Sequence, residues 1–347
     1  MNGRPDLGPV VAVSIIALLA GQVAIAQVDW TYQDLAVSPG PPGSWDSGRH
    51  LVGDVVFDGT TYHMYLLGGE TTVPWNSPWS IGHWTSTSLD GPWLEDLNNP
   101  VLEPEPGQWD GTTIYSAAVL YDPDAMMFRM WYGATNGSLG QGTAGYAESP
   151  DGSFWTKYAA NPLAGLEPGT PGTWNDGKIF PGTVIKDGAS YHMWFVAFEY
   201  NGGANDLWRV GHATSSDGLT WSQSPDPVLV ATKPWEGTRV YNIEVVRIGD
   251  AYGMWYTGLT AVPTLAYVGY AVSPDGTHWG KWPDNPVISP LPSCNGFDSI
   301  AVIRVGDTFH GWGTNCYDVW HLTSPFEVLF FDDFESGGTS VWSPVLP

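Results

Sequence analysis

Positive charge is scarce in this sequence. Its 347 residues include 12 lysines and arginines against 36 aspartates and glutamates, which leaves a formal net charge of −24 at pH 7. Proteins that bind nucleic acid carry a surplus of basic side chains, so this composition argues against a nucleic-acid partner. Charged residues of both signs make up only 14% of the chain, which is below the roughly 25% of ordinary globular proteins.

The apolar segment at the N-terminus is too short and too interrupted to anchor the chain in a membrane. It covers residues 9–26 and contains Ser14, Gly21 and Gln22, whereas a membrane-spanning helix needs about 20 apolar residues. It ends in the small-x-small pattern that signal peptidase accepts. We therefore predict a signal peptide over residues 1–26, cleavage after Ala26, a secreted or periplasmic protein, and no membrane span after processing.

Cysteine is nearly absent. Cys294 and Cys316 are the two cysteines, and they lack the partner spacing of a zinc site. In an oxidising compartment we expect them to form a disulfide. By restricting the unfolded chain, this bond would stabilise the fold by roughly 3 kcal/mol. Two free thiols are the alternative. We predict no cofactor and no metal site, although the acidic surface could weakly attract calcium.

Turn-forming and aromatic residues are abundant instead. Glycine and proline number 43 and 29, tryptophan reaches 20, and 43% of residues are hydrophobic. A chain this apolar can form a sizeable core, which excludes disorder. The many turn residues predict short strands rather than long helices.

A repeat of about 63 residues organises the chain. An aromatic residue followed by an acidic or amide residue recurs at intervals of 64, 65, 61 and 62 residues; these pairs begin at Trp45, Trp109, Trp174, Trp235 and Phe297. Each is followed by two strands and a tight turn, as in VVFDGTTYHMYLLGG, and then by a third strand such as VGYAVSP. A turn such as SPDGTHW leads to a fourth strand ending in NPVI, and Asp-Gly at this spacing is a strong hairpin signal.

Five such units predict an all-β fold, a five-bladed β-propeller with four antiparallel strands per blade. The fifth unit lacks its last strand, and the segment WTYQDLAVSPG resembles the outer strand of unit four. We therefore predict that residues 28–39 complete the fifth blade and close the ring. The predicted propeller covers residues 27–327, and residues 328–347 form an acidic tail.

The segment VGYAVSPDGTHWGKWPDNPVISP and its three relatives resemble the five-bladed propellers of glycoside hydrolase families 43, 32, 68 and 130. The resemblance covers residues 28–325 and implies a carbohydrate substrate. Those families carry acids at three first-strand positions where this chain shows LVGDVV, YSAAVL and FPGTVI. Only Asp54 resembles the first of them, so no catalytic residue is carried over. The strings SSDGLTW and SPDGTHW also resemble the Asp-box turns of sialidases, whose three arginines would correspond here to Arg49, Arg239 and Arg304.

Residues that break the repeat are the best functional candidates, because stacking requirements common to all blades cannot explain them. The repeated acids Asp46, Asp110 and Glu236 are expected to satisfy backbone donors at turns. Nine residues past the first four anchors, by contrast, stand Asp54, Ala118, Thr183 and Glu244. We expect such departures to gather at one mouth of the central axis.

Glycoside hydrolysis needs two carboxyl groups, one protonated and one ionised. Four acids are candidates for this pair, namely Asp54, Glu199, Glu244 and Asp298. The expected substrate-binding residues are Arg49, His50, Lys178, Arg239, Asn242, Trp75 and Trp79; Trp208 occupies the equivalent loop of the third unit. The sequence thus predicts a monomeric, secreted glycosidase acting on an oligo- or polysaccharide. A non-catalytic carbohydrate-binding propeller and a sialidase-like hydrolase are the alternatives.

Overall fold

The computed structural model describes residues 23–27, 29–72, 78–137, 142–199, 201, 206–261, 264–290 and 294–331. These residues form β-strands joined by turns, together with one turn of 3-10 helix, η1 (Pro234–Glu236). The expected all-β class is confirmed. No helix within these ranges is long and apolar enough to cross a membrane.

Four units of four antiparallel strands follow one another along the chain. The first contains β3 (Arg49–Phe57), β4 (Tyr62–Gly69), β5 (Ser80–Ser86) and β6 (Leu94–Glu95). The second contains β7 (Thr113–Asp122), β8 (Met127–Thr135), β9 (Thr143–Ser149) and β10 (Thr156–Lys157). The third contains β11 (Ile179–Asp187), β12 (Ser190–Glu199), β13 (Leu207–Ser215) and β14 (Ser222–Gln223). The fourth contains β15 (Arg239–Ile248), β16 (Ala251–Leu259), β17 (Ala266–Ser273) and β18 (Gly280–Lys281).

The fifth unit combines the two ends of the described chain. Its strands are β19 (Phe297–Val305), β20 (Thr308–Asn315), β21 (Asp318–Pro325) and β2 (Thr31–Val37). β2 pairs antiparallel with β21, and it falls within the segment 28–39 that the sequence assigned to this place. In the full chain a separate two-stranded sheet pairs β1 (Val23–Gln27) with β22 (Glu327–Phe331); the predicted cleavage after Ala26 would remove all of β1 except Gln27.

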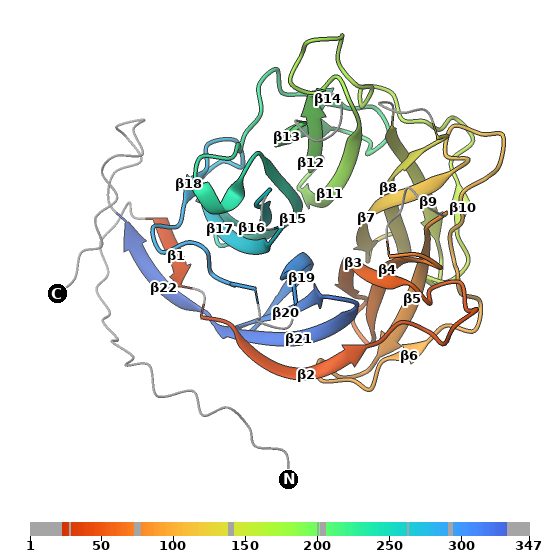
Figure 1. The fold of residues 1–347 in the computed structure, drawn as a ribbon, viewed down its shortest axis with the longest axis horizontal. Helices are drawn as coiled ribbons and strands as arrows, with labels where there is room; N and C mark the ends of the chain where they lie inside the picture. Colours follow the sequence, from red (N-terminus) through yellow and green to blue (C-terminus); the bar gives the residue numbers. More distant parts are fainter. Residues whose placement is uncertain are drawn as a thin grey trace.

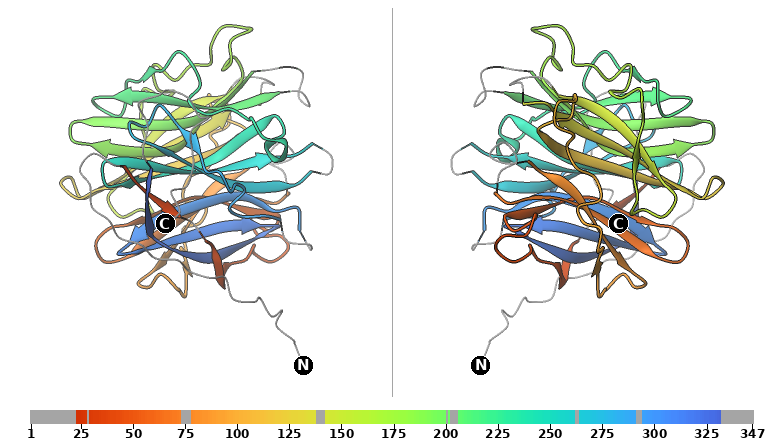
Figure 2. Two further views of the ribbon diagram at one scale, coloured as in Figure 1. Left: turned by 90° about the vertical axis from the view of Figure 1, so that its left-hand side faces the viewer. Right: turned by 90° about the vertical axis from the view of Figure 1, so that its right-hand side faces the viewer.

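The first strands of the five units lie around one centre (Figure 1). β3 contacts β7, β7 contacts β11, β11 contacts β15, β15 contacts β19, and β19 contacts β3. In the side views of Figure 2 the strands run across the short dimension of the molecule, so their turns gather on two opposite faces. We use "the mouth" for the end at which the five first strands begin.

Burial along the strands follows from this arrangement. The second strands are sandwiched between neighbouring units, so both of their faces are covered; β4 and β16 are buried along nearly their whole length. The sequence of a strand that is buried on both faces is nearly continuously apolar. The sequences of β4, YHMYLLGG, and β16, AYGMWYTGL, have this pattern. β2 lies at the outer edge and is largely exposed.

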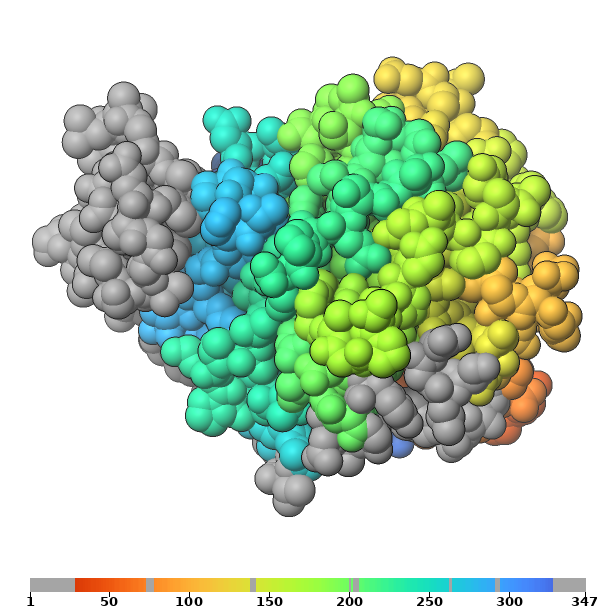
Figure 3. All heavy atoms as spheres, turned by 90° about the horizontal axis from the view of Figure 1, so that it is seen from above, coloured from red at the N-terminus to blue at the C-terminus, as the bar shows by residue number. Residues whose placement is uncertain are grey.

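The Asp-Gly turns of the third and fourth units join each of these units to the one before it. The indole of Trp131 donates to the Gly218 carbonyl of the next unit over 2.7 Å, and the indole of Trp194 donates to the Gly276 carbonyl over 2.7 Å. Both glycines have positive φ, +75° and +80°, a conformation that favours glycine. Figure 3 shows the third unit (green) from outside, between its two neighbours. These turns therefore have a structural role.

The repeated acids have partners within the fold, but not only the backbone donors that the sequence predicted: Glu236 accepts from the backbone amides of Thr232 and Lys233, whereas Asp110 accepts from side chains. Asp110 accepts from Lys157 over 2.6 Å, and Glu236 accepts from Lys281 over 2.6 Å and from Tyr256 over 2.8 Å. Both carboxylates are buried. A buried charge needs such partners because it has lost its hydration.

Candidate functional site

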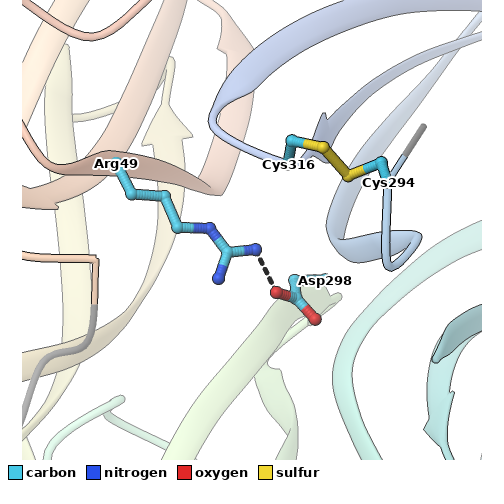
Figure 4. The surroundings of a disulfide bond; sticks show 4 residues. All are labelled: Arg49, Cys294, Asp298 and Cys316. Atoms are coloured by element: carbon cyan, nitrogen blue, oxygen red, sulfur yellow. Dashed lines mark hydrogen bonds and ion pairs between the residues drawn. A yellow bond between two sulfur atoms is a disulfide. The ribbon is translucent and has the colours of Figure 1, made fainter. Parts of the chain in front are cut away.

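Asp298 lies at the centre of the mouth and links three units. One carboxylate oxygen accepts from the Tyr241 hydroxyl over 3.0 Å, and the other forms an ion pair with Arg49. The Asp298 carbonyl accepts from the Asn242 amide and, over 3.4 Å, from the Thr257 hydroxyl. Figure 4 shows Arg49 extending from β3 toward Asp298 at the start of β19. The sequence placed Arg49, Asn242 and Asp298 at one mouth, and these contacts bring the three together.

The disulfide borders this cluster. Cys294 and Cys316 are bonded, with their Cα atoms 5.6 Å apart, which confirms the expected pair. The bond joins the segment before β19 to the turn after β20, beside Arg49 and Asp298 (Figure 4). It therefore fixes the backbone from which Asp298 projects.

Irregular pairing of the first strands shapes the mouth. All five strands shift register against their second strands near their beginnings. In β19 the shift falls at Asp298, between Phe297 and Ser299. In β15 it falls between Tyr241 and Glu244, and Asn242 there has φ of +42°, in the left-handed region. A β-bulge redirects side chains, which explains how residues from neighbouring strands converge here.

Asp54 and Glu244 occupy equivalent places deeper in the first strands. Asp54 lies opposite Tyr65, and Glu244 lies opposite Trp255. The same register places Ala118, Thr183 and Ala301 opposite Trp131, Trp194 and Trp312. The alignment made from the sequence is therefore correct for the first four units. In the fifth unit Ala301 stands only four residues past Phe297, so Phe297 is not equivalent to the other anchors. Two of the five equivalent positions carry acids.

Both acids are buried, with exposed fractions of 7% and 5%. Asp54 accepts from the Val55 amide over 2.7 Å and from the Val119 amide of the second unit over 2.6 Å. Glu244 accepts from the Thr183 hydroxyl of the third unit over 3.2 Å. The two acids thus also connect neighbouring units.

Burial raises the pKa of both carboxyl groups, because a low-dielectric environment disfavours the charged form. The pKa of Asp54 rises to about 7, although its two backbone amides act in the opposite direction. The pKa of Glu244 rises well above its ordinary value, through burial first and then through the charge of Asp54. Both effects favour the protonated form of the Glu244 carboxyl group.

Cations and aromatic rings form the rest of the mouth. The Lys178 ammonium lies 4.6 Å from the centroid of the Tyr115 ring, and the Arg239 guanidinium lies 5.6 Å from that of Trp208. Phe180 lies between them, with its ring centroid 4.9 Å from Tyr115 and 6.4 Å from Trp208. Lys178 and Arg239, both expected here from the sequence, thus lie along one aromatic row.

Two expected binding residues are buried instead, so those predictions were wrong. His50 is fully buried and lies 2.8 Å from Asp46; it follows Arg49 on a strand, and successive side chains point to opposite faces. Trp79 is 1% exposed and packs so closely on Gly69 that a Cβ there would lie 2.3 Å from its ring. Trp79 also links the first unit to the second, because its backbone amide donates to the Thr113 hydroxyl over 3.1 Å. Trp75 lies outside the described residues.

Two further candidates form contacts with residues outside the Asp298 cluster. Glu199 ends β12, a second strand, and its carboxylate is held by both terminal nitrogens of Arg209 at 3.1 Å. Arg304 lies near the far end of β19, where it donates to the Gly306 carbonyl over 2.9 Å. It therefore does not join Arg49 and Arg239 at the mouth, and the three-arginine arrangement of the sialidase alternative is absent.

Tyr115 and Tyr241 were missed by sequence reasoning. They stand six residues past their anchors, where the third unit has Phe180 and the first has Leu51. An aromatic residue recurring at this strand position was the available signal. Among the described residues, no group of three or more histidine, cysteine or acidic side chains is arranged to hold a metal ion.

The comparisons with known proteins point to glycoside hydrolases. Residues 172–299 match the family model "Glycosyl hydrolases family 32 N-terminal domain". Two Mycobacterium tuberculosis proteins, "Uncharacterized protein MT1551" (strain CDC 1551 / Oshkosh) and "Uncharacterized protein Rv1502" (strain ATCC 25618 / H37Rv), are each 30% identical over 243 residues. Each match covers 65% of this chain and 75% of the relative.

Solved structures of similar fold include one named "Glycoside hydrolase", with a TM-score of 0.68 and 18% identity over 86% of this chain and 92% of the other. A structure described under "The GH130 family of mannoside phosphorylases contains glycoside hydrolases that target beta-1,2 mannosidic linkages in Candida mannan" has a TM-score of 0.65 and 14% identity, covering 88% and 95%. A thermostable family-43 glycoside hydrolase has a TM-score of 0.57 and 19% identity, covering 86% and 94%. At these identities the likeness concerns the fold.

Proposed function

Since the chain belongs to the same family as the two Mycobacterium tuberculosis proteins and has the fold of propeller glycoside hydrolases, we propose that it hydrolyses glycosidic bonds at the mouth. One observation carries this proposal. Ala118 and Ala301 fill, fully buried, the strand position at which two other units carry Asp54 and Glu244. The fold therefore does not require an acid there, and burying two interacting acids costs stability.

The proposed chemistry needs one protonated and one ionised carboxyl group. Glu244, protonated because of its burial, donates a proton to the leaving oxygen as the glycosidic C–O bond breaks. Asp298, with its charge balanced by Arg49, supplies the carboxylate that stabilises the sugar cation or activates water. Asp54 acts through Glu244, because its charge helps to raise the pKa of that group. Glu199 receives no catalytic role.

The test is hydrolysis of a panel of arabino-, xylo-, fructo- and mannosides by the wild type and by four variants. We expect Glu244→Gln and Asp298→Asn to lower kcat by about 100-fold or more, since general acid catalysis contributes on that order. Asp54→Asn should move the basic limb of the pH profile to lower pH. The control Glu199→Gln should retain wild-type activity. Activity that survives both Glu244→Gln and Asp298→Asn would refute this assignment.

A non-catalytic carbohydrate-binding propeller is the second proposal, and a specific observation favours it. Asp54 is held by two backbone amides, and Asp298 by Arg49 and Tyr241, so both acids already have partners in the fold. Glycan binding by wild-type protein that leaves every glycan intact would establish this function instead.

We also propose that the five units are the blades of one closed ring, in which β2 joins the ends of the chain. The pairing of β2 with β21 and the contact of β19 with β3 support this. Deleting residues 27–40 should sharply lower the melting temperature. An unchanged melting temperature would disprove the closure.

Export through the predicted signal peptide is likewise a proposal, supported by the disulfide, since such bonds persist in oxidising compartments. Expression of the full chain in a bacterial host should yield a mature protein that begins at Gln27. An uncleaved N-terminus in the cytoplasmic fraction would contradict it.

A further inference from the structure

Lys178 and Arg239 occupy the same place in two adjacent units. Each stands four residues past its anchor, and each forms a parallel bridge to the preceding unit: Lys178 pairs with Gly142, just before β9, and Arg239 pairs with Trp208 in β13. Both are half-buried. Because the two units have the same strand arrangement, these two cationic side chains occupy equivalent positions at the mouth.

The surroundings of Lys178 differ from those of the structural lysines. Lys157 and Lys281 each donate to a buried carboxylate over 2.6 Å. Lys178 instead donates to the neutral Tyr115 hydroxyl over 3.3 Å. Burial lowers the pKa of Lys178, and the charge of Asp206 acts against that shift. A half-buried ammonium whose hydrogen bond goes to a phenol gains more from an incoming anion than one already bound to a carboxylate.

The aromatic row leads from these cations to the proposed catalytic acids. Beyond Phe180, the rings of Trp208 and Tyr241 lie 5.7 Å apart, and the Tyr241 hydroxyl donates to Asp298. Aromatic faces pack on the apolar faces of sugar rings. Phe180 itself is buried, so a glycan would meet the partly exposed rings of Tyr115, Trp208 and Tyr241, which lie beside Lys178 and Arg239.

We propose that the mouth binds an acidic glycan, and that Lys178 and Arg239 bind carboxylates of its uronic acid residues. This inference rests on the proposed glycan function and names its substrate class. A neutral sugar offers no charge to these two groups. The chain has a net charge of −24, so most of its surface would repel a polyanion. The cations at the mouth would therefore favour binding of a polyanion there.

The experiment compares each acidic ligand with its neutral counterpart. Oligosaccharides of galacturonate, alginate and glucuronoxylan, each beside its carboxyl-reduced form, are titrated into the full chain by calorimetry at low and high salt. We expect at least one acidic form to bind ten-fold or more tightly than its reduced form, with an affinity that falls as salt rises. Lys178→Met should remove that ten-fold preference without weakening binding of the reduced form, and Lys178→Arg should restore it.

Lys233→Met is the matched control, because Lys233 is an exposed cation of the fourth unit that adjoins η1. It should leave both affinities unchanged, and the melting temperature of every variant should match the wild type. Equal affinity for acidic and reduced forms would overturn this inference while the proposed function stood. An acidic form that binds without being cleaved would support it and overturn hydrolysis. Failure to bind or cleave any glycan would overturn both.

Discussion

Replacing Asp54 by asparagine should destabilise the protein in acid but not at alkaline pH. The pKa of Asp54 is raised from 3.8 to about 7 in the folded protein. Between these two values the folded state binds more protons than the unfolded state, so this residue's contribution to stability falls as pH rises. A shift of this size corresponds to about 4 kcal/mol at pH values above 7. Asparagine does not ionise and therefore lacks this dependence.

The hydrogen bonds of Asp54 set the effect of the substitution in acid. Its two carboxyl oxygens accept from Val55 and Val119, whereas an asparagine amide can accept through only one atom. The variant leaves one buried N–H without a partner, which costs about 1–3 kcal/mol. We expect Asp54→Asn to be less stable than wild type by that amount at pH 4, and as stable or more stable at pH 8.

Denaturant unfolding at pH 4, 6 and 8 measures this difference directly. The control is Asp122→Asn, another buried acid. Burial opposes the ionisation of Asp122, but the hydrogen bond and charge of Lys186 and the charge of Arg129 still lower its pKa. That acid contributes stability above its unfolded pKa and loses it in acid, so the control should be most destabilised at neutral pH. A difference between wild type and Asp54→Asn that does not change from pH 4 to pH 8 would refute the raised pKa.

Two further predictions concern the framework. Trp194→Phe should lower the free energy of unfolding by about 1 kcal/mol through its lost hydrogen bond, because the buried Gly276 carbonyl loses one of its two donors and keeps the Trp279 indole. Trp255→Phe removes the same volume from a fully buried ring but should lower it by less, since the Trp255 indole has no hydrogen-bond partner among the described residues; equal losses in denaturant unfolding would contradict this account. Reducing the Cys294–Cys316 disulfide, which closes a loop of 22 residues, should lower the denaturation midpoint by the equivalent of about 3 kcal/mol. A midpoint unaffected by dithiothreitol would show that the bond contributes nothing.

Much of the architecture was predictable because it repeats. The spacing of the aromatic anchors located the units, and the Asp-Gly turns located the third and fourth strands of most of them. The match between WTYQDLAVSPG and an outer strand assigned residues 28–39 to the last sheet, where β2 pairs with β21. The same alignment placed Asp54 and Glu244 at one strand position, and the cross-strand register agrees.

Burial of single residues was harder to predict. Trp79 follows a proline in a polar segment, which suggested an exposed rim, yet the neighbouring Gly69 leaves a space that its ring fills. His50 is adjacent to Arg49, and proximity in the sequence suggested a shared location. Strand alternation separates them, and a one-residue error in register is enough to exchange the buried and exposed faces.

Tyr115 and Tyr241 were missed for the same physical reason. Tyr115 and Tyr241 look like ordinary strand residues, and a period of two would place them by simple alternation. Each instead stands where its first strand changes register, at Tyr115 itself in β7 and just after Tyr241 in β15. A bulge adds a residue to one strand without changing residue type. A departure in chemistry, such as an acid in place of alanine, is visible in an alignment of repeats, whereas a departure in register is visible only once the strands are paired.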